Sequence, residues 1–158
     1  MCLLAAEVEL RQATQLLWEG KAVSQDLTNE TQKYLGYDVP VIRPVEAGKN
    51  LANLIRQYDF TLFEYFQTDV AGHHRVREKA EFRLSQLDMF IGSFLANSNL
   101  DNTLVILNSD HGNIEDLSVK THTKNKVPCL LVGKFQADRV KKLQSILDVA
   151  PMVEDLFL

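Results

Sequence analysis

Three short apolar runs, rich in aromatic and β-branched residues, set the strongest limit on how this chain can fold. They lie at about 60–66, 103–108 and 127–132. Runs of this length and composition predict strands that are buried on both faces. Segments with helical periodicity separate them. This alternation predicts an α/β fold with a mostly parallel sheet flanked by helices.

Apolar residues recur with the period of an α-helix in the segments between and around these runs. The spacing predicts helices at about 2–18, 46–58, 76–96 and 146–157. Gly20 fits the C-cap of the first helix. A short helix start at 27–30 and a connection with two prolines, Gly36 to Pro44, fill the space before the second.

Length and composition indicate one soluble domain spanning residues 1–158. The net charge of −4 and the pI near 5.5 argue against a nucleic-acid partner. No apolar stretch approaches the roughly 18 residues of a membrane span, and the start lacks the basic region of a signal peptide. Cys2 and Cys129 lie far apart, and Cys129 sits in an apolar run where we expect it to be buried. We therefore expect a reducing compartment, the cytoplasm.

Metal-ligand residues accompany each of the three apolar runs. Asp69-Val-Ala-Gly-His73 follows the first, Ser109-Asp110-His111-Gly112-Asn113 follows the second, and Thr121-His122-Thr123 precedes the third. Functional groups in open α/β sheets collect beyond the carboxyl ends of the strands, so we expect Asp69 and Asp110 to be neighbours. Gly72 and Gly112 would let the backbone turn tightly beside them.

The residue types indicate the chemistry. Mixed carboxylate and imidazole ligation suits Zn²⁺ or Mn²⁺ better than Ca²⁺ or Mg²⁺. Two such ions about 4 Å apart could clamp a phosphoryl group and activate a hydroxyl nucleophile.

Each motif taken alone has a plainer interpretation. The Asp69 to His73 spacing is common by chance, Asp110 could cap amides in a turn, and His122 could be a surface histidine. Only their occurrence together, in order, favours a metal site. The other polar residues of these segments are interpreted as exposed or solvated: His74, Glu115 and Asp116.

The combined series resembles the alkaline phosphatase superfamily, and within it the cofactor-independent phosphoglycerate mutase and phosphopentomutase branch. The resemblance covers about residues 59–158, including the closing segment Leu147 to Phe157. It implies an alkaline-phosphatase-like fold, two divalent metal ions (Mn²⁺ or Zn²⁺, with Mg²⁺ a further candidate) and a small phosphorylated substrate. It assigns one ion to Asp69, His73 and His122, and the second to Asp110 and His111.

Two parts of the family pattern have no counterpart in this sequence. Members carry a further Asp on a first strand and then a Ser or Thr nucleophile, whereas the first aspartate here is Asp26. The catalytic nucleophile is therefore unassigned, since three early hydroxyl residues match no such motif: Ser24, Thr28 and Thr31. The phosphate-binding residues are also unassigned. Three basic residues could face an anion or form a solvated helix start: Arg75, Arg77 and Lys79.

Two interpretations of function follow. In the first, the chain is the C-terminal part of a phosphatase, phosphodiesterase or phosphomutase whose N-terminal part is missing or supplied as a separate segment. In the second, it is a non-catalytic metal-binding or interaction domain derived from such an enzyme. In the first case we expect negligible activity from the chain alone. We also expect an exposed apolar patch and self-association, because the missing strands would normally cover the apolar face of the helix from Leu3 to Trp18.

Overall fold

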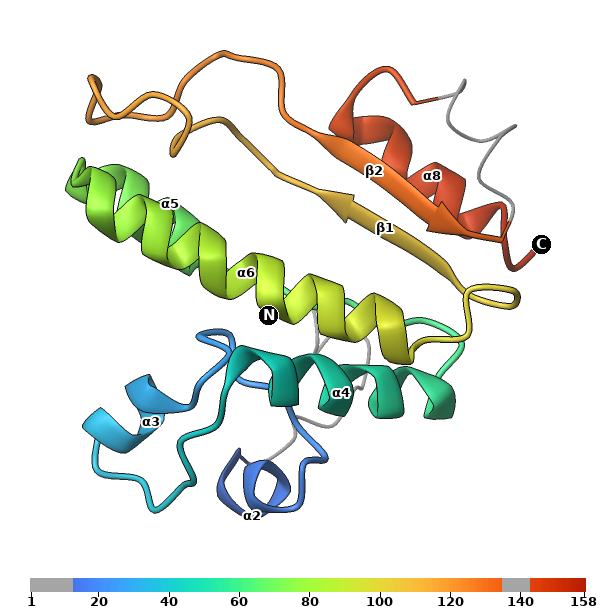
Figure 1. Cartoon of the computed structure of the whole chain (residues 1–158). Coiled ribbons are helices and arrows are strands. Elements are labelled where there is room, and N and C mark those ends of the chain that lie inside the picture. The colour runs from blue at the N-terminus through green and yellow to red at the C-terminus, as the bar shows by residue number, and fades with distance from the viewer. Residues whose placement is uncertain (1–12, 135–142) are drawn as a thin grey trace.

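The computed structural model describes residues 13–134 and 143–158. Two long helices, α4 (Pro44–Leu54) and α6 (Arg77–Asn97), lie side by side, and a β-ribbon runs along the other side of α6 (Figure 1). The ribbon consists of β1 (Leu104–Asn108) and β2 (Cys129–Gly133). The shorter elements are α2 (Ala13–Trp18), α3 (Glu30–Tyr34), η1 (Ile55–Gln57), α5 (Gln67–His74), η2 (Ile146–Asp148) and α8 (Val149–Glu154).

The core lies between α4 and α6. Pro44 occupies the first turn of α4, where its fixed φ suits a helix start, and the Arg43 backbone N–H donates to the Glu46 carboxylate at 2.9 Å. Gly48 faces α6 so closely that a Cβ there would lie 2.5 Å from the Phe90 carbonyl oxygen. The helices therefore meet backbone to backbone. Six buried side chains fill this contact: Leu27, Ala47, Leu51, Ala52, Phe90 and Phe94.

The two strands pair antiparallel, with Leu104 opposite Gly133 and Asn108 opposite Cys129. Our prediction of a mostly parallel sheet is wrong for this pair. Parallel neighbours need a crossover, usually a helix. Residues 109–128, all of which the structure describes, contain turns and one isolated bridge but no helix. Cys129 is exposed at the start of β2, contrary to our expectation of burial. The next residue, Leu130, is exposed as well, so the described residues do not cover this end of the ribbon.

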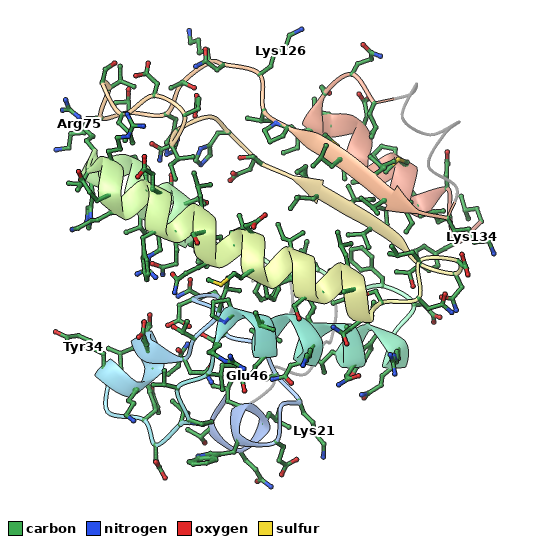
Figure 2. The ribbon with its side chains drawn as sticks, viewed as in Figure 1. Lys21, Tyr34, Glu46, Arg75, Lys126 and Lys134 are labelled. Carbon is green, nitrogen blue, oxygen red and sulfur yellow. The ribbon has the colours of Figure 1, made fainter. Side chains whose placement is uncertain are left out.

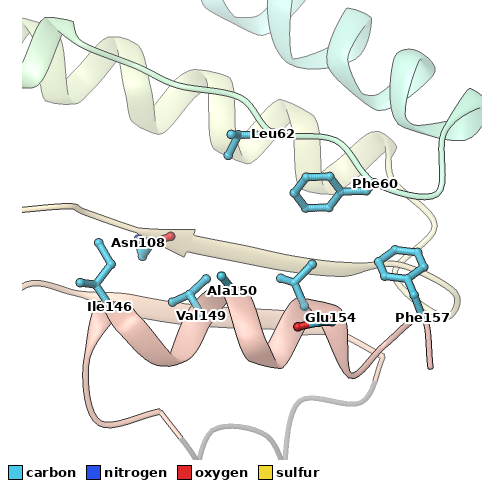
Figure 3. Close-up of a pocket in the computed structure, with 9 residues that line it drawn as sticks. Phe60, Leu62, Asn108, Ile146, Val149, Ala150, Glu154 and Phe157 are labelled. Atoms are coloured by element: carbon cyan, nitrogen blue, oxygen red, sulfur yellow. The ribbon is translucent and has the colours of Figure 1, made fainter. Parts of the chain in front are cut away.

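The predicted strand at 60–66 is extended but belongs to no sheet of the described residues. Its side chains alternate as in a strand: Phe63 and Tyr65 pack against the core, whereas Phe60, Leu62 and Phe66 are exposed. The exposed side faces an open groove of about 700 Å³ (Figure 3). The far wall is the end of β1 together with η2 and α8, including Ile146, Val149, Val153 and Phe157.

Most of the predicted helices are confirmed. α6 matches the prediction for 76–96, and α4 with η1 matches 46–58. η2 and α8 account for most of 146–157. Of the predicted helix at 2–18, residues 2–12 lie outside the described residues, and α2 forms the rest. Gly20 has φ of +66° and follows this helix as expected for a C-cap.

Residues 24–31 form a tight buried turn that the sequence did not indicate. Asp26 is 2% exposed, and its carboxylate accepts the backbone N–H groups of Thr28, Asn29 and Thr31 at 3.2, 2.8 and 2.6 Å. Burial raises the pKa of Asp26, but these hydrogen bonds and that of the Ser24 hydroxyl outweigh it, so the pKa is lowered overall. The turn anchors α3 to the core.

No helix within residues 13–134 and 143–158 combines the length and the apolar character needed to cross a membrane.

Candidate metal centre

Helix α5 carries two of the candidate ligands, Asp69 and His73. We expected Asp69 at the end of a strand, but it lies in the first turn of α5. His73 is four residues further on, so both side chains share one helix face. The Nδ1 atom of His73 lies 2.9 Å from the Lys120 carbonyl oxygen. A carbonyl can only accept, so Nδ1 carries the proton and Nε2 is left free to bind a metal.

The loop after β1 brings His122 to the same face. The Asp69 Oδ1 atom lies 3.5 Å from His73 Nε2 and 3.4 Å from His122 Nε2. The two Nε2 atoms are 3.2 Å apart. Ligand atoms that bind one tetrahedral ion at about 2.1 Å are separated by about 3.4 Å. These three residues could therefore hold a single ion.

Asp110 and His111 lie beside this triangle. His111 Nε2 is 3.9 Å from Asp69 Oδ1, and its ring stacks on that of His122 with centroids 3.6 Å apart. Its Nδ1 atom is buried without a hydrogen-bond partner among the described residues. Asp110 is at the rim, with its side chain 76% exposed, and Oδ1 also accepts the N–H of His111 at 3.0 Å. The turn-capping interpretation of Asp110 and its proximity to the site are thus both observed.

Asn113 supports Asp69 in a way that sequence reasoning missed. Its Nδ2 atom donates to Asp69 Oδ1 at 2.5 Å and to the Asp69 carbonyl at 3.1 Å, and Asn113 is 5% exposed. A Cβ on Gly72 would lie 2.6 Å from Asn113 Cγ. We expected Gly72 and Gly112 to allow tight turns. For Gly72 that reason is wrong, because the residue lies inside α5. For Gly112 it stays a prediction, and bends at Asp110 and His111 directly precede it. Gly72 instead makes room for Asn113.

Glu115 is also more than the solvated loop charge we expected. Its carboxylate accepts the Asn113 backbone N–H at 2.6 Å, the Asn125 side chain at 3.0 Å and the Thr123 hydroxyl. The hydrogen bond from Thr123 lowers the pKa of Glu115. These partners lie two to ten residues away, and no sequence pattern shows that they converge. Asp116, by contrast, accepts only local hydrogen bonds among the described residues, from Ser118.

The basic residues near the site contact the loop and other side chains on the helix surface. His74 is exposed as expected, and its Nδ1 lies 3.3 Å from Lys79 Nζ. Arg75 Nε donates to the Leu117 carbonyl oxygen at 3.2 Å, and Arg77 pairs with Glu81 at 2.7 Å. Arg75 lies at the end of the molecule opposite Lys134 (Figure 2). The geometry therefore favours the solvated interpretation of these residues.

The fold and the cluster define a class of protein: a carboxylate and three imidazoles, gathered where a strand and a helix end, are a donor set typical of metal-dependent enzymes. The model of the family described as the Metalloenzyme superfamily matches residues 5–158. The chain belongs to this family.

Curated relatives are 2,3-bisphosphoglycerate-independent phosphoglycerate mutases. The chain is 33% identical to one from Pyrococcus abyssi over 87 residues, 54% of this chain and 20% of the relative. It is 31% identical to one from Desulforudis audaxviator over 112 residues, which are 67% of this chain and 22% of the relative. It is 28% identical to mutase 2 of Methanosarcina acetivorans over 145 residues, which are 86% of this chain and 26% of the relative. The chain thus spans about a fifth to a quarter of their length. No solved structure matches it.

Proposed function

We propose that this chain supplies the metal-binding part of a phosphoryl-transfer site. Asp69, His73 and His122 bind one divalent ion, and Asp110 and His111 contribute to a second. The observation that carries the proposal is the triangle of ligand atoms, whose edges of 3.2–3.5 Å fit one ion. The donor set suits Mn²⁺ or Zn²⁺. The names of the mutase relatives support a small phosphorylated substrate.

The residues of the chain have separate roles in this proposal. Bound ions would offset the charge of the phosphoryl oxygens as Lewis acids. Asp69 supplies the negative charge at the centre of the cluster, and the Lys120 carbonyl sets the tautomer of His73. Asp110 is the most exposed of the five and marks the side open to substrate. Ser109, although adjacent, donates its hydroxyl to the His111 carbonyl at 2.7 Å and holds the turn.

The open groove supports a further part of the proposal, a polypeptide segment that completes the site. Among the described residues β1 pairs only with β2, which leaves its other edge open. No backbone group of residues 59–65 makes a hydrogen bond to another described backbone group. An extended segment with alternating apolar residues could pair with β1 and cover Phe60 and Leu62. Such a segment would carry the nucleophile that we could not assign.

Metal titration tests the site. The 158-residue chain should bind about one Mn²⁺ tightly and a second weakly by calorimetry. His122→Ala should remove the tight ion. His74→Ala is the matched control, because His74 is exposed and next to His73 but outside the triangle. Equal binding by the parent and the His122 variant would remove His122 from the site.

Hydrolysis of a generic phosphate ester tests the chemistry. We expect negligible turnover by the chain alone, since an in-line attack needs a positioned nucleophile. Addition of a strand-bearing N-terminal segment from a mutase relative should restore metal-dependent turnover. Ordinary turnover by the chain alone, abolished by Asp110→Ala, would place the nucleophile within these residues. If the chain binds the metal tightly but shows no turnover either alone or with the added segment, the non-catalytic interpretation is favoured.

A further inference from the structure

The loop between β1 and β2 must hold His122 in place without help from a helix or a strand of its own. Residues 109–128 contribute ligands from both ends of the loop, Asp110 and His111 first and His122 later. An isolated antiparallel bridge joins Gly112 to Thr123, with the Thr123 N–H donating to the Gly112 carbonyl at 2.9 Å. The Ser109 N–H also donates to the Pro128 carbonyl at 3.4 Å at the base of the loop. Two contacts tie the loop to α5, between His73 Nδ1 and the Lys120 carbonyl and between Arg75 Nε and the Leu117 carbonyl. Side-chain contacts between the two halves add to this framework.

The Glu115 carboxylate supplies those contacts. Its Oε2 atom accepts the Asn113 N–H at 2.6 Å on the first half of the loop. Its Oε1 atom accepts the Thr123 hydroxyl and, at 3.0 Å, the Asn125 amide on the second half. A Cβ on Gly112 would lie 2.6 Å from Glu115 Oε1, so the glycine makes room for the carboxylate.

We propose that Glu115 is a positioning residue of the metal centre: it ties the two halves of the loop together and thereby holds His122 against Asp69 and His73. The effect on metal binding rests on the proposed function. The effect on the position of His122 does not need a metal. Glu115 lies outside the group of ligand atoms that could share one ion, and both of its carboxylate oxygens accept from loop donors. Thr123, which it binds, directly follows His122. A change at Glu115 therefore acts on the site through the position of His122.

The experiment compares Glu115→Gln with Asp116→Asn. The glutamine keeps the shape but replaces one acceptor oxygen with a donor amide, so at least one of the three hydrogen bonds is lost. Asp116 is a matched control, because within residues 13–134 and 143–158 its carboxylate accepts only from Ser118, in the same half of the loop. Thr123→Val is a second variant that removes the partner and leaves Glu115 intact.

The first measurement is metal-free. In the full chain with labelled histidines, ring protons of His111 and His122 should show an NOE in the parent, because the rings stack at 3.6 Å. The NOE should persist in Asp116→Asn and be lost in Glu115→Gln and Thr123→Val. Its retention in both of the latter variants, or its absence in the parent, would overturn the proposal.

The second measurement is Zn²⁺ affinity. Loss of a group that orients a ligand typically weakens binding 10–100-fold. We expect about a tenfold loss in Glu115→Gln and a similar loss in Thr123→Val. The loss in the double variant should be smaller than the product of the two, since both changes act on one group of contacts. Unchanged affinity in both single variants would refute the role. If the parent bound no Zn²⁺, the proposed function would fail, while the NOE comparison would still decide the inference about Glu115.

Discussion

Substitution of Gly72 by alanine should damage the metal centre by adding one methyl group to a helix. The new Cβ would lie 2.6 Å from Asn113 Cγ and 3.0 Å from Nδ2. Ordinary contacts need about 3.5 Å, so the Asn113 side chain must move by about 1 Å. A shift of that size breaks its hydrogen bond to Asp69 Oδ1, which is 2.5 Å long. The Asp69 carboxylate would then lose the group that orients it.

Two opposing effects set the change in stability. Alanine in place of glycine inside a helix stabilises by about 1 kcal/mol. Loss of a hydrogen bond to a charged group costs about 1.5–3 kcal/mol, and the low end applies because Asp69 is 38% exposed and screened by solvent. The free energy of unfolding should therefore fall by only about 0.5–1 kcal/mol, which corresponds to roughly 1–4 °C in the melting temperature. Mn²⁺ affinity should fall about 10–100-fold.

Gly92→Ala is the matched control. Gly92 lies inside α6, and no atom of the described residues outside its own helix and chain neighbours would come within 4 Å of an added Cβ. This variant should be stabilised by about 1 kcal/mol and bind Mn²⁺ as the parent does. Thermal melting by circular dichroism and Mn²⁺ calorimetry would be measured on both variants. If Gly72→Ala is stabilised like Gly92→Ala and keeps the parent's affinity, Asn113 does not orient Asp69.

Three further predictions follow from the same structure. Gly48→Ala should lower the free energy of unfolding by about 1–3 kcal/mol in urea denaturation, because the added methyl group would lie 2.5 Å from the Phe90 carbonyl oxygen. A more stable variant would contradict the backbone contact between α4 and α6. Asp26→Ala should lower the free energy of unfolding by about 2–5 kcal/mol by leaving buried N–H groups without an acceptor. The pKa of Asp26 is lower in the folded protein, so its carboxylate stabilises the fold above the unfolded pKa of about 3.9, and this stabilisation is lost as pH falls through the folded pKa. Asp26→Asn should therefore weaken the dependence of the free energy of unfolding on pH in that window. An unchanged pH profile would refute this. Serine at both Leu62 and Phe157 should reduce binding of a hydrophobic dye and self-association, and equal dye binding would show that the groove is not the exposed apolar surface.

The candidate ligands were accessible from the sequence because their spacing is local. Asp69 and His73 stand four residues apart, and an α-helix places such a pair on one face whatever surrounds it. The structure brings the His122 Nε2 atom to 3.4 Å from Asp69 Oδ1. That these three residues bind a metal stays a prediction. The structure also places His111 closer to this group than a separate second site would require, with Nε2 3.9 Å from Asp69.

The supporting residues were not accessible. Asn113 reaches Asp69 across 44 residues of chain, and Glu115 binds partners on both halves of a loop. Such contacts depend on where loops return in space, which no periodicity records. For the same reason the sequence could not distinguish Glu115 from Asp116. We interpreted both as solvated charges, although Glu115 joins the two halves of the loop and Asp116 accepts from Ser118 nearby.

For this chain the sequence by itself determined α4, because an apolar stripe with a period near 3.6 residues predicts a helix from local spacing alone. It also predicted α6, although several of the apolar residues of that helix are exposed: Phe82, Leu84 and Met89. It also indicated which residues could bind a metal, which stays a prediction. The tertiary structure decided how strands pair, since the apolar run of residues 60–66 has strand-like alternation but no partner among the described residues, and β1 and β2 run antiparallel. Strand pairing joins residues distant in sequence, so its direction and partners are properties of the whole fold.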